Sequence, residues 1–165
     1  MSRKAVLEVR ELETTFFSDS GKVAAVDRIS FSIHEGEILA IVGESGCGKS
    51  VTSLSIMGLV PSPPGKITNG EILLKGQDIS KLSDKQMRKI RGNEIAMIFQ
   101  EPMTSLNPLF TIGNQLIEAI RIHHPKWSKK EASARAVEIM KLVGLPRAEQ
   151  LLKDYPHQLS GGMRQ

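Results

Sequence analysis

The sequence contains a single cysteine, Cys47, and this scarcity excludes an internal disulfide and any zinc site built from several cysteines. A reducing, cytoplasmic setting is therefore favoured. The chain also lacks a long apolar run, because its longest strongly apolar stretch, Ile38 to Val42, is far shorter than the roughly 20 residues of a membrane helix. We expect neither a membrane span nor a secretory signal.

The basic residues are spread along the chain, with only short clusters. The net charge of +4 suits nucleic acid, an anionic membrane surface or a phosphate ligand, and it does not choose among them. Short basic clusters are typical of a solvated helix face, because a stripe that binds polyanions is more concentrated. The two clusters of this kind contain Lys85, Arg88, Lys89 and Arg91 in one, and Lys126, Lys129 and Lys130 in the other.

The N-terminal part predicts a sheet, since Val6–Phe17 and Val23–Ile33 are strand-like and a polar turn at 18–22 joins them as an antiparallel pair. Residues 37–42 and 95–99 are short and almost wholly apolar, a pattern typical of strands buried on both faces of a sheet.

Helical patterns occupy much of the remaining chain. We expect helices over Lys49–Leu59 and Ser83–Ile90, with Ser83 as an N-cap, and a strand over Gly70–Leu74 between them. From Gly113 onward, apolar residues at helical spacing predict a helical insert that ends at Gly144. With 165 residues of which 40% are hydrophobic, the chain is long enough for a soluble globular domain with its own core.

The segment from Gly43 to Ser50 is GESGCGKS, which matches the phosphate-loop pattern G-x-x-x-x-G-K-[ST] between a predicted strand and a predicted helix. Glycines there let successive backbone N–H groups face an anion at the start of the helix. Lys49 then supplies a charge for the β- and γ-phosphates, and the Ser50 hydroxyl is placed to ligate magnesium. The alternative is a glycine-rich turn without a ligand, which gives no reason for lysine followed by serine.

The expected nucleotide contacts of this loop extend one residue beyond the motif. They are Gly43, Glu44, Ser45, Gly46, Cys47, Gly48, Lys49, Ser50 and Val51. Cys47 is interpreted as a small loop residue and not as a nucleophile, because no histidine neighbours it and the loop acts through its backbone.

Four strings carry a resemblance that extends over essentially the whole chain. LSGGMRQ at 159–165 resembles the signature motif of the ATP-binding subunits of ABC transporters, and IFQEP at 98–102 resembles their Q-loop. GESGCGKSVTSLSIMGL at 43–59 and FQEPMTSLNPLFTIG at 99–113 are similar to the subfamily that serves bacterial oligopeptide, dipeptide and nickel importers.

This resemblance implies an α/β fold, that of a P-loop NTPase of the ABC type with an N-terminal antiparallel β-subdomain and a helical insert. Residues 1–165 would form a partial ABC ATPase domain, incomplete at the C-terminus. Residues 1–102 would form the β-subdomain and the phosphate-loop core through the Q-loop. Residues 103–165 would form the helical subdomain, which ends in the signature motif.

The resemblance also implies roles for residues outside the phosphate loop. In the family each nucleotide lies between the phosphate loop of one subunit and the signature motif of another, so Ser160, Gly161 and Gly162 would contact ATP in trans. Gln100 would bind Mg²⁺ beside Ser50 and sense the γ-phosphate. The catalytic residues would be Lys49, Gln100 and Ser160.

Two assignments rest on weaker patterns. Phe16 corresponds to the family's adenine-stacking aromatic residue, with Phe17 as the alternative, although an aromatic residue in a strand is more often part of the core. Met103 to Phe110 would lie near the groove through which force passes to the membrane partners.

The sequence departs from the family pattern after the signature motif. Family members continue with an apolar strand that ends in Asp-Glu, where the glutamate polarises water, and then with a switch histidine. None of these residues follows the signature motif here, and all four histidines precede it, so none of them can be the switch histidine. We therefore expect the general base to be absent and the chain to be a truncated subunit that does not hydrolyse ATP alone. Its apolar sheet and helix surfaces would then be exposed.

The sequence is therefore interpreted as the ATP-binding part of a bacterial peptide importer, with ATP and Mg²⁺ as ligands. Its partners would be a second ATPase subunit in a head-to-tail dimer, transmembrane permease subunits and, indirectly, an external peptide-binding protein. It would lie on the cytoplasmic face of the membrane. The alternatives are an ATP-binding fragment without turnover and a soluble ABC ATPase that acts on nucleic acid, although no nucleic acid partner is expected.

Overall fold

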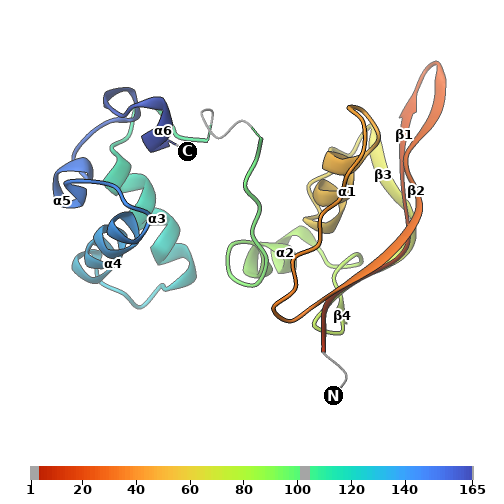
Figure 1. Ribbon diagram of the computed structural model, residues 1–165, viewed down its shortest axis with the longest axis horizontal. Helices are drawn as coiled ribbons and strands as arrows, with labels where there is room; N and C mark the ends of the chain where they lie inside the picture. Colours follow the sequence, from red (N-terminus) through yellow and green to blue (C-terminus); the bar gives the residue numbers. More distant parts are fainter. Residues whose placement is uncertain (1–3, 101–104, 165) are drawn as a thin grey trace. The chain divides into compact units, whose positions relative to one another are not determined.

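The computed structural model describes residues 4–100 and 105–164, which belong to two compact units, Met1–Met97 and Ile98–Gln165 (Figure 1). The predicted boundary after residue 102 lies outside the described residues and stays a prediction. None of the helices formed by residues 4–100 and 105–164 has the length and apolar content that crossing a membrane requires.

The first unit contains a four-stranded sheet in the order β2-β1-β3-β4, and all of its strand pairs are antiparallel. The strands are β1 (Ala5–Ser18), β2 (Gly21–His34), β3 (Gly65–Leu74) and β4 (Gln77–Asp78). The long β1–β2 hairpin confirms the predicted antiparallel start, and it turns where the sequence is polar. Glu11 interrupts the register of β1 with a positive φ of 47°, as in a β-bulge.

Two helices complete this unit, α1 (Lys49–Ile56) against the sheet and α2 (Asp84–Ile90) beside it (Figure 1). Helix α1 ends earlier than predicted, because Gly58 adopts a left-handed φ of 61° and the Leu59 N–H donates to the Leu54 carbonyl. Helix α2 begins as predicted, since Ser83 and Gln86 form a capping box.

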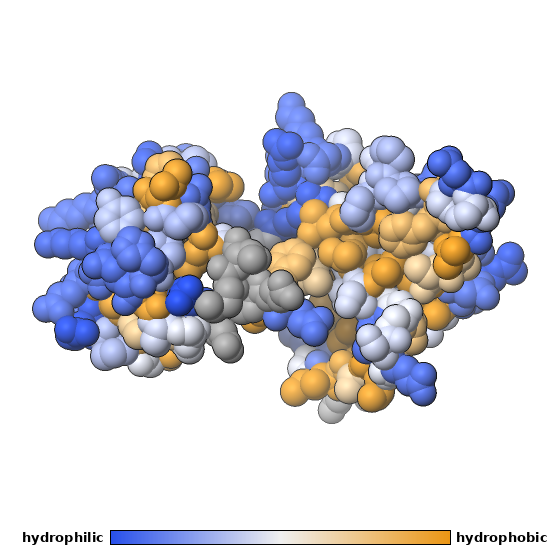
Figure 2. Space-filling model, turned by 90° about the horizontal axis from the view of Figure 1, so that it is seen from above, coloured by the Kyte–Doolittle hydropathy of each residue, from blue (hydrophilic) through white to orange (hydrophobic). Residues whose placement is uncertain are grey.

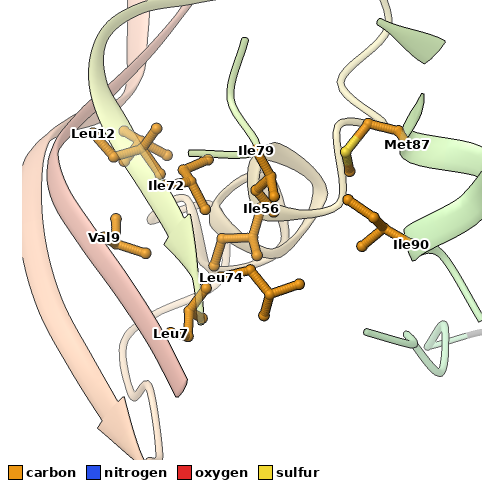
Figure 3. Close-up of a cluster of buried hydrophobic side chains, with 10 residues drawn as sticks. Leu7, Val9, Leu12, Ile56, Ile72, Leu74, Ile79, Met87 and Ile90 are labelled. Atoms are coloured by element: carbon orange, nitrogen blue, oxygen red, sulfur yellow. The ribbon is translucent and has the colours of Figure 1, made fainter. Parts of the chain in front are cut away.

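The core of the first unit lies between the sheet and these two helices. Ile56 of α1 lies among side chains of β1 and β3, and residues of α2 close the cluster on the other side (Figure 3). Burial of such side chains stabilises the fold by about 1.5 to 3 kcal/mol each. The cluster contains Leu7, Val9, Leu12, Val26, Ile56, Ile72, Leu74, Ile79, Met87 and Ile90.

The prediction of strands at residues 37–42 and 95–99 is wrong. Residues 37–42 form no strand, and Ile38 and Val42 are 97% and 90% exposed. Residues 95–99 contribute only an isolated bridge between Ile95 and Arg91. A strand inside a sheet pairs with a neighbouring strand along each edge, and the described part of the chain supplies no such neighbours for these segments. Apolar side chains are therefore prominent on the face of this unit seen in Figure 2.

The second unit is helical, which confirms the predicted insert. It consists of α3 (Ile112–His123), α4 (Lys129–Leu142), α5 (Ala148–Leu151), the short 3₁₀ helix η2 (Pro156–Gln158) and α6 (Gly161–Arg164). Thr111 caps α3 and Ser128 caps α4, and Gly144 ends α4 with a left-handed φ of 80° as predicted. Its core contains Ile112, Met140, Ala148, Leu151 and Leu159.

Candidate functional site

The glycine-rich loop lies at the start of α1, and two of its glycines have the backbone conformation that the sequence motif requires. Gly46 and Gly48 have φ values of 86° and 93°, in the left-handed region that residues with a side chain rarely adopt. Gly48 also lies close to β2, because a Cβ at this position would be 2.2 Å from the Ala25 carbonyl oxygen. A glycine at residue 48 therefore lets the loop both turn and lie against the sheet.

Gly43 has a different physical reason to be glycine. It lies outside the left-handed region, but a Cβ on it would be 2.5 Å from the Cys47 sulfur. The loop therefore folds back on itself so that its first glycine lies against the Cys47 side chain. The Cys47 N–H donates to the Glu44 carbonyl at 3.3 Å, which closes the same turn.

The Lys49 ammonium lies across this loop. Its Nζ donates to the Gly43 and Glu44 carbonyl oxygens at 2.8 and 2.6 Å, and it lies 3.5 Å from the Cys47 sulfur. These acceptors are uncharged, and Lys49 forms no ion pair with a carboxylate of residues 4–100 or 105–164. The Lys49 ammonium is therefore not ion-paired within the described residues and can exchange its neutral acceptors for an anionic ligand.

The start of α1 adds to this positive potential. The first turn of the helix contains no acidic residue, so the partial positive charge of its N–H groups is not neutralised by a neighbouring side chain. Ser50 is exposed there, as are Glu44 and Ser45. The Val51 side chain packs against the core of the first unit.

Buried hydroxyl groups hold α1 against β1. The Thr14 and Ser55 hydroxyls are hydrogen-bonded at 2.8 Å, and both residues are almost wholly buried. Ser55 also donates to the Val51 carbonyl at 2.7 Å, and Thr52 donates to the Gly48 carbonyl at 3.0 Å. These contacts fix the helix whose first turn carries the loop.

Sequence analysis missed a residue that anchors the other end of α1. Arg91 donates from Nε to the Met57 carbonyl at 2.8 Å and from Nη2 to the Gly58 carbonyl at 2.7 Å. Its side chain is only 20% exposed, so the prediction of a solvated face is wrong for this residue. No local pattern gives these bonds, because they join residues more than 30 positions apart. Hydrogen bonding from Arg91 and the charge of Arg88 also lower the pKa of Asp84.

The predicted adenine contact, Phe16, lies on β1 opposite Val23 of β2 and Gly65 of β3. Its ring is partly buried, and a Cβ on Gly65 would be 2.9 Å from its Cε1 atom. Phe17 is more exposed, and the Lys22 ammonium lies 5.6 Å from the centre of its ring. Which of these rings stacks on a base stays a prediction.

The other predicted site residues belong to the second unit. Gln100 is exposed at a bend. Residues 101–104, which include the last two residues of the predicted Q-loop and Met103, lie outside the described residues, as does Gln165. Ser160 caps α6, since its hydroxyl accepts from the Met163 N–H at 3.3 Å. A Cβ on Gly161 or Gly162 would meet nothing within 4 Å, so the backbone there is open to a ligand.

Comparison with known proteins identifies the family. Residues 26–165 match the family model described as ABC transporter, and this range contains both the glycine-rich loop and the signature motif.

This chain belongs to the ABC transporter family.

Other members of the ABC transporter family support this assignment in sequence and in structure. The chain is 56% identical over 160 residues to the oligopeptide transport ATP-binding protein AppD of Bacillus subtilis, and 55% identical to the dipeptide transport ATP-binding protein DppD of the same organism. The fold resembles the dimeric structure of MJ0796, a bacterial ABC transporter cassette, with a TM-score of 0.82 and 28% identity. These findings confirm the predicted family and fold.

This ABC family chain is shorter than the proteins that it matches. The alignments with AppD and DppD cover 97% of this chain but 48% of each relative, and that with MJ0796 covers 96% of this chain and 65% of that protein. The chain therefore spans about half the length of the curated relatives.

Proposed function

We propose that this chain is the ATP-binding component of a bacterial ABC importer for peptides. The observation that carries the proposal is the loop at 43–50, where left-handed glycines and a Lys49 ammonium bonded only to neutral acceptors lie at the start of α1. The similarity to AppD and DppD, whose names describe oligopeptide and dipeptide transport, supports peptides as the cargo.

The loop suits the polyphosphate of ATP for reasons of charge and geometry. Backbone N–H groups at a helix N-terminus bind phosphate oxygens, and the Lys49 ammonium exchanges neutral carbonyl acceptors for anionic ones. The exposed Ser50 hydroxyl fits Mg²⁺, which prefers oxygen ligands and needs only one or two from the protein because it keeps several waters. Bound Mg²⁺ would neutralise charge on the phosphates, and Gln100 is the second protein ligand that we propose.

In the intact subunit, hydrolysis would use positioning and electrostatic stabilisation. Lys49 holds the β- and γ-phosphates, and Ser160, Gly161 and Gly162 of a second subunit contact the same nucleotide in trans. The partners that we propose are this second ATPase subunit, transmembrane permease subunits on the cytoplasmic face of the membrane and, indirectly, an external peptide-binding protein. A relative of this fold, MJ0796, has been solved as a dimer.

The nucleotide site is tested by the affinity of the 165-residue chain for Mg²⁺-ATP, measured by calorimetry. Lys49→Ala removes charge-assisted hydrogen bonds of about 1.5 to 3 kcal/mol each, which predicts a roughly tenfold to hundredfold loss of affinity. Lys85→Ala is the matched control, because Lys85 is an exposed lysine on α2 outside the loop. Equal affinities of the Lys49→Ala variant and the wild type would refute the site.

Binding without turnover is the second candidate function for the chain on its own. It is favoured by the extent of the match, because the chain covers 48% of AppD and of DppD, and turnover is proposed only for the intact subunit. We expect the chain to bind ATP and to release no phosphate in a single-turnover assay. Phosphate release that Lys49→Ala abolishes would contradict this expectation and would mean that another residue of the chain acts as the base.

A further inference from the structure

The ten residues from Arg121 in the last turn of α3 to Lys130 in the first turn of α4 carry four cations and no acidic residue. Arg121, Lys126, Lys129 and Lys130 lie between Glu118 and Glu131 in the sequence. The Glu131 carboxylate is part of the capping box of α4, since it accepts hydrogen bonds from the Ser128 N–H and hydroxyl, both at 2.7 Å. The only carboxylate within this basic segment, residues 121–131, is therefore directed at the backbone and at Ser128.

These four cations differ from the other basic cluster of the chain. On α2, Arg88 and Arg91 both pair with Asp84 at 2.9 and 3.0 Å. By contrast, the cations of the basic segment form no ion pair with any residue in the described ranges 4–100 and 105–164. In the α2 cluster two of the four cations share one carboxylate, whereas none of the four cations of the basic segment is paired with one among the described residues. The two clusters look alike in sequence, and only the structure shows this difference in pairing.

The helix to which two of these lysines belong does not favour positive charge at their positions. Lys129 and Lys130 are the first two residues of α4, where the helix dipole destabilises a cation. These two lysines therefore do not stabilise the fold through the helix dipole. Their replacement by a neutral residue is expected to leave the fold intact or to stabilise it.

Apolar and aromatic side chains accompany the cations. Phe110 and Ile122 are 52% and 67% exposed. They line an open hollow of about 490 Å³ together with Arg121, Lys129 and one acidic residue, Glu118, which forms no ion pair with either cation. Trp127, the only tryptophan of the sequence, stacks on His124 with ring centres 4.4 Å apart. Lysine, arginine and tryptophan beside exposed apolar side chains are the combination that binds the interface of an anionic membrane.

We propose that the basic segment, residues 121–131, contacts an anionic phospholipid surface directly. A lipid surface fits better than a protein groove, because the long lysine side chains have no fixed partners and a fluid layer of headgroups needs no defined acceptor positions. Attraction to such a surface contributes roughly fivefold in affinity for each lysine that approaches it. This inference does not rest on the nucleotide site, since it uses neither the phosphate loop nor ATP.

The test uses the 165-residue chain and vesicles of phosphatidylcholine with or without phosphatidylglycerol, in the absence of nucleotide. Sedimentation with the vesicles gives the affinity, and the fluorescence of Trp127 reports on the basic segment because the chain has no other tryptophan. We expect binding only to the anionic vesicles, with a blue shift of Trp127 emission that high salt reverses.

Two variants of equal net charge distinguish binding by the basic segment from binding by the overall positive charge of the chain. Replacing Lys126, Lys129 and Lys130 by glutamine should weaken vesicle binding about a hundredfold. Replacing the exposed lysines Lys66, Lys85 and Lys89 by glutamine should leave it nearly unchanged. A thermal melt of each variant shows that it is folded.

Several results would overturn the proposal. They are failure to bind anionic vesicles at low salt, equal losses in the two triple variants, and binding that leaves Trp127 emission unchanged. If polyglutamate shifts Trp127 emission while anionic vesicles do not, the partner is an acidic protein segment and the lipid proposal is wrong. Loss of ATP binding in Lys49→Ala with unchanged vesicle binding would support both sites as independent.

Discussion

Replacement of Gly48 by alanine gives the most direct test of how the phosphate loop is held. Gly48 has a φ of 93°, and its Cβ would lie 2.2 Å from the Ala25 carbonyl oxygen of β2. The alanine side chain therefore meets two obstacles. A left-handed backbone costs about 1 to 2 kcal/mol, and the collision forces the loop or the strand to move by about 1 Å, at a further cost of about 1 to 3 kcal/mol.

Gly36→Ala separates these two costs. Gly36 also has a left-handed φ, of 74°, but a Cβ there meets nothing within 4 Å, and the residue lies outside the phosphate loop. This variant should lose only the backbone contribution of about 1 to 2 kcal/mol. The difference between the two variants therefore measures the close approach of Gly48 to β2.

The assay is urea unfolding of the full chain, followed by far-ultraviolet circular dichroism, together with calorimetry of Mg²⁺-ATP binding. We expect Gly48→Ala to reduce the free energy of unfolding by about 1 to 3 kcal/mol more than Gly36→Ala. ATP affinity should fall in Gly48→Ala and stay unchanged in Gly36→Ala. Equal stabilities of the two variants would refute the packing of the loop against Ala25.

Two further predictions concern charged side chains of the first unit. Arg91→Ala should lower the free energy of unfolding by about 2 to 4 kcal/mol, because two carbonyls at the end of α1 lose a charged donor. Arg88→Ala should change it little, since the Arg88 side chain is 77% exposed. Equal effects of the two substitutions in a urea titration would contradict the role of Arg91. Burial alone would raise the pKa of Asp78, but hydrogen bonds from Ser80 and Lys81 outweigh it and lower the pKa from 3.8 to about 2. Because the folded pKa is below the unfolded one, this carboxylate stabilises the fold above pH about 4 and the contribution disappears as pH falls towards 2. The stability difference between wild type and Asp78→Asn should therefore shrink by about 1 to 2 kcal/mol between pH about 6 and pH about 2, and a pH-independent difference would exclude this explanation.

Much of the fold could be predicted from local patterns. The β1–β2 hairpin follows from alternating strands around a polar turn, and the caps at Ser83 and Gly144 follow from residue types that suit helix ends. The segments at 37–42 and 95–99 could not be assigned correctly in this way. Their apolar composition predicts buried strands, but pairing depends on neighbours that are distant in sequence, and the described residues provide none.

The sequence by itself determined the family and the phosphate loop, because the loop's chemistry depends on residue types at fixed spacing along one short segment. Only the tertiary structure showed how the loop and its helix are held in place. The approach of Gly48 to Ala25 and the hydrogen bonds of Arg91 to the end of α1 join parts of the chain that are distant in sequence. The same holds for charge, since Asp84 pairs with Arg88 and Arg91 of one basic cluster, whereas no carboxylate of the described residues forms an ion pair with the cations of the basic segment. Sequence spacing gives the number of charges, whereas their compensation depends on which side chains the fold brings together.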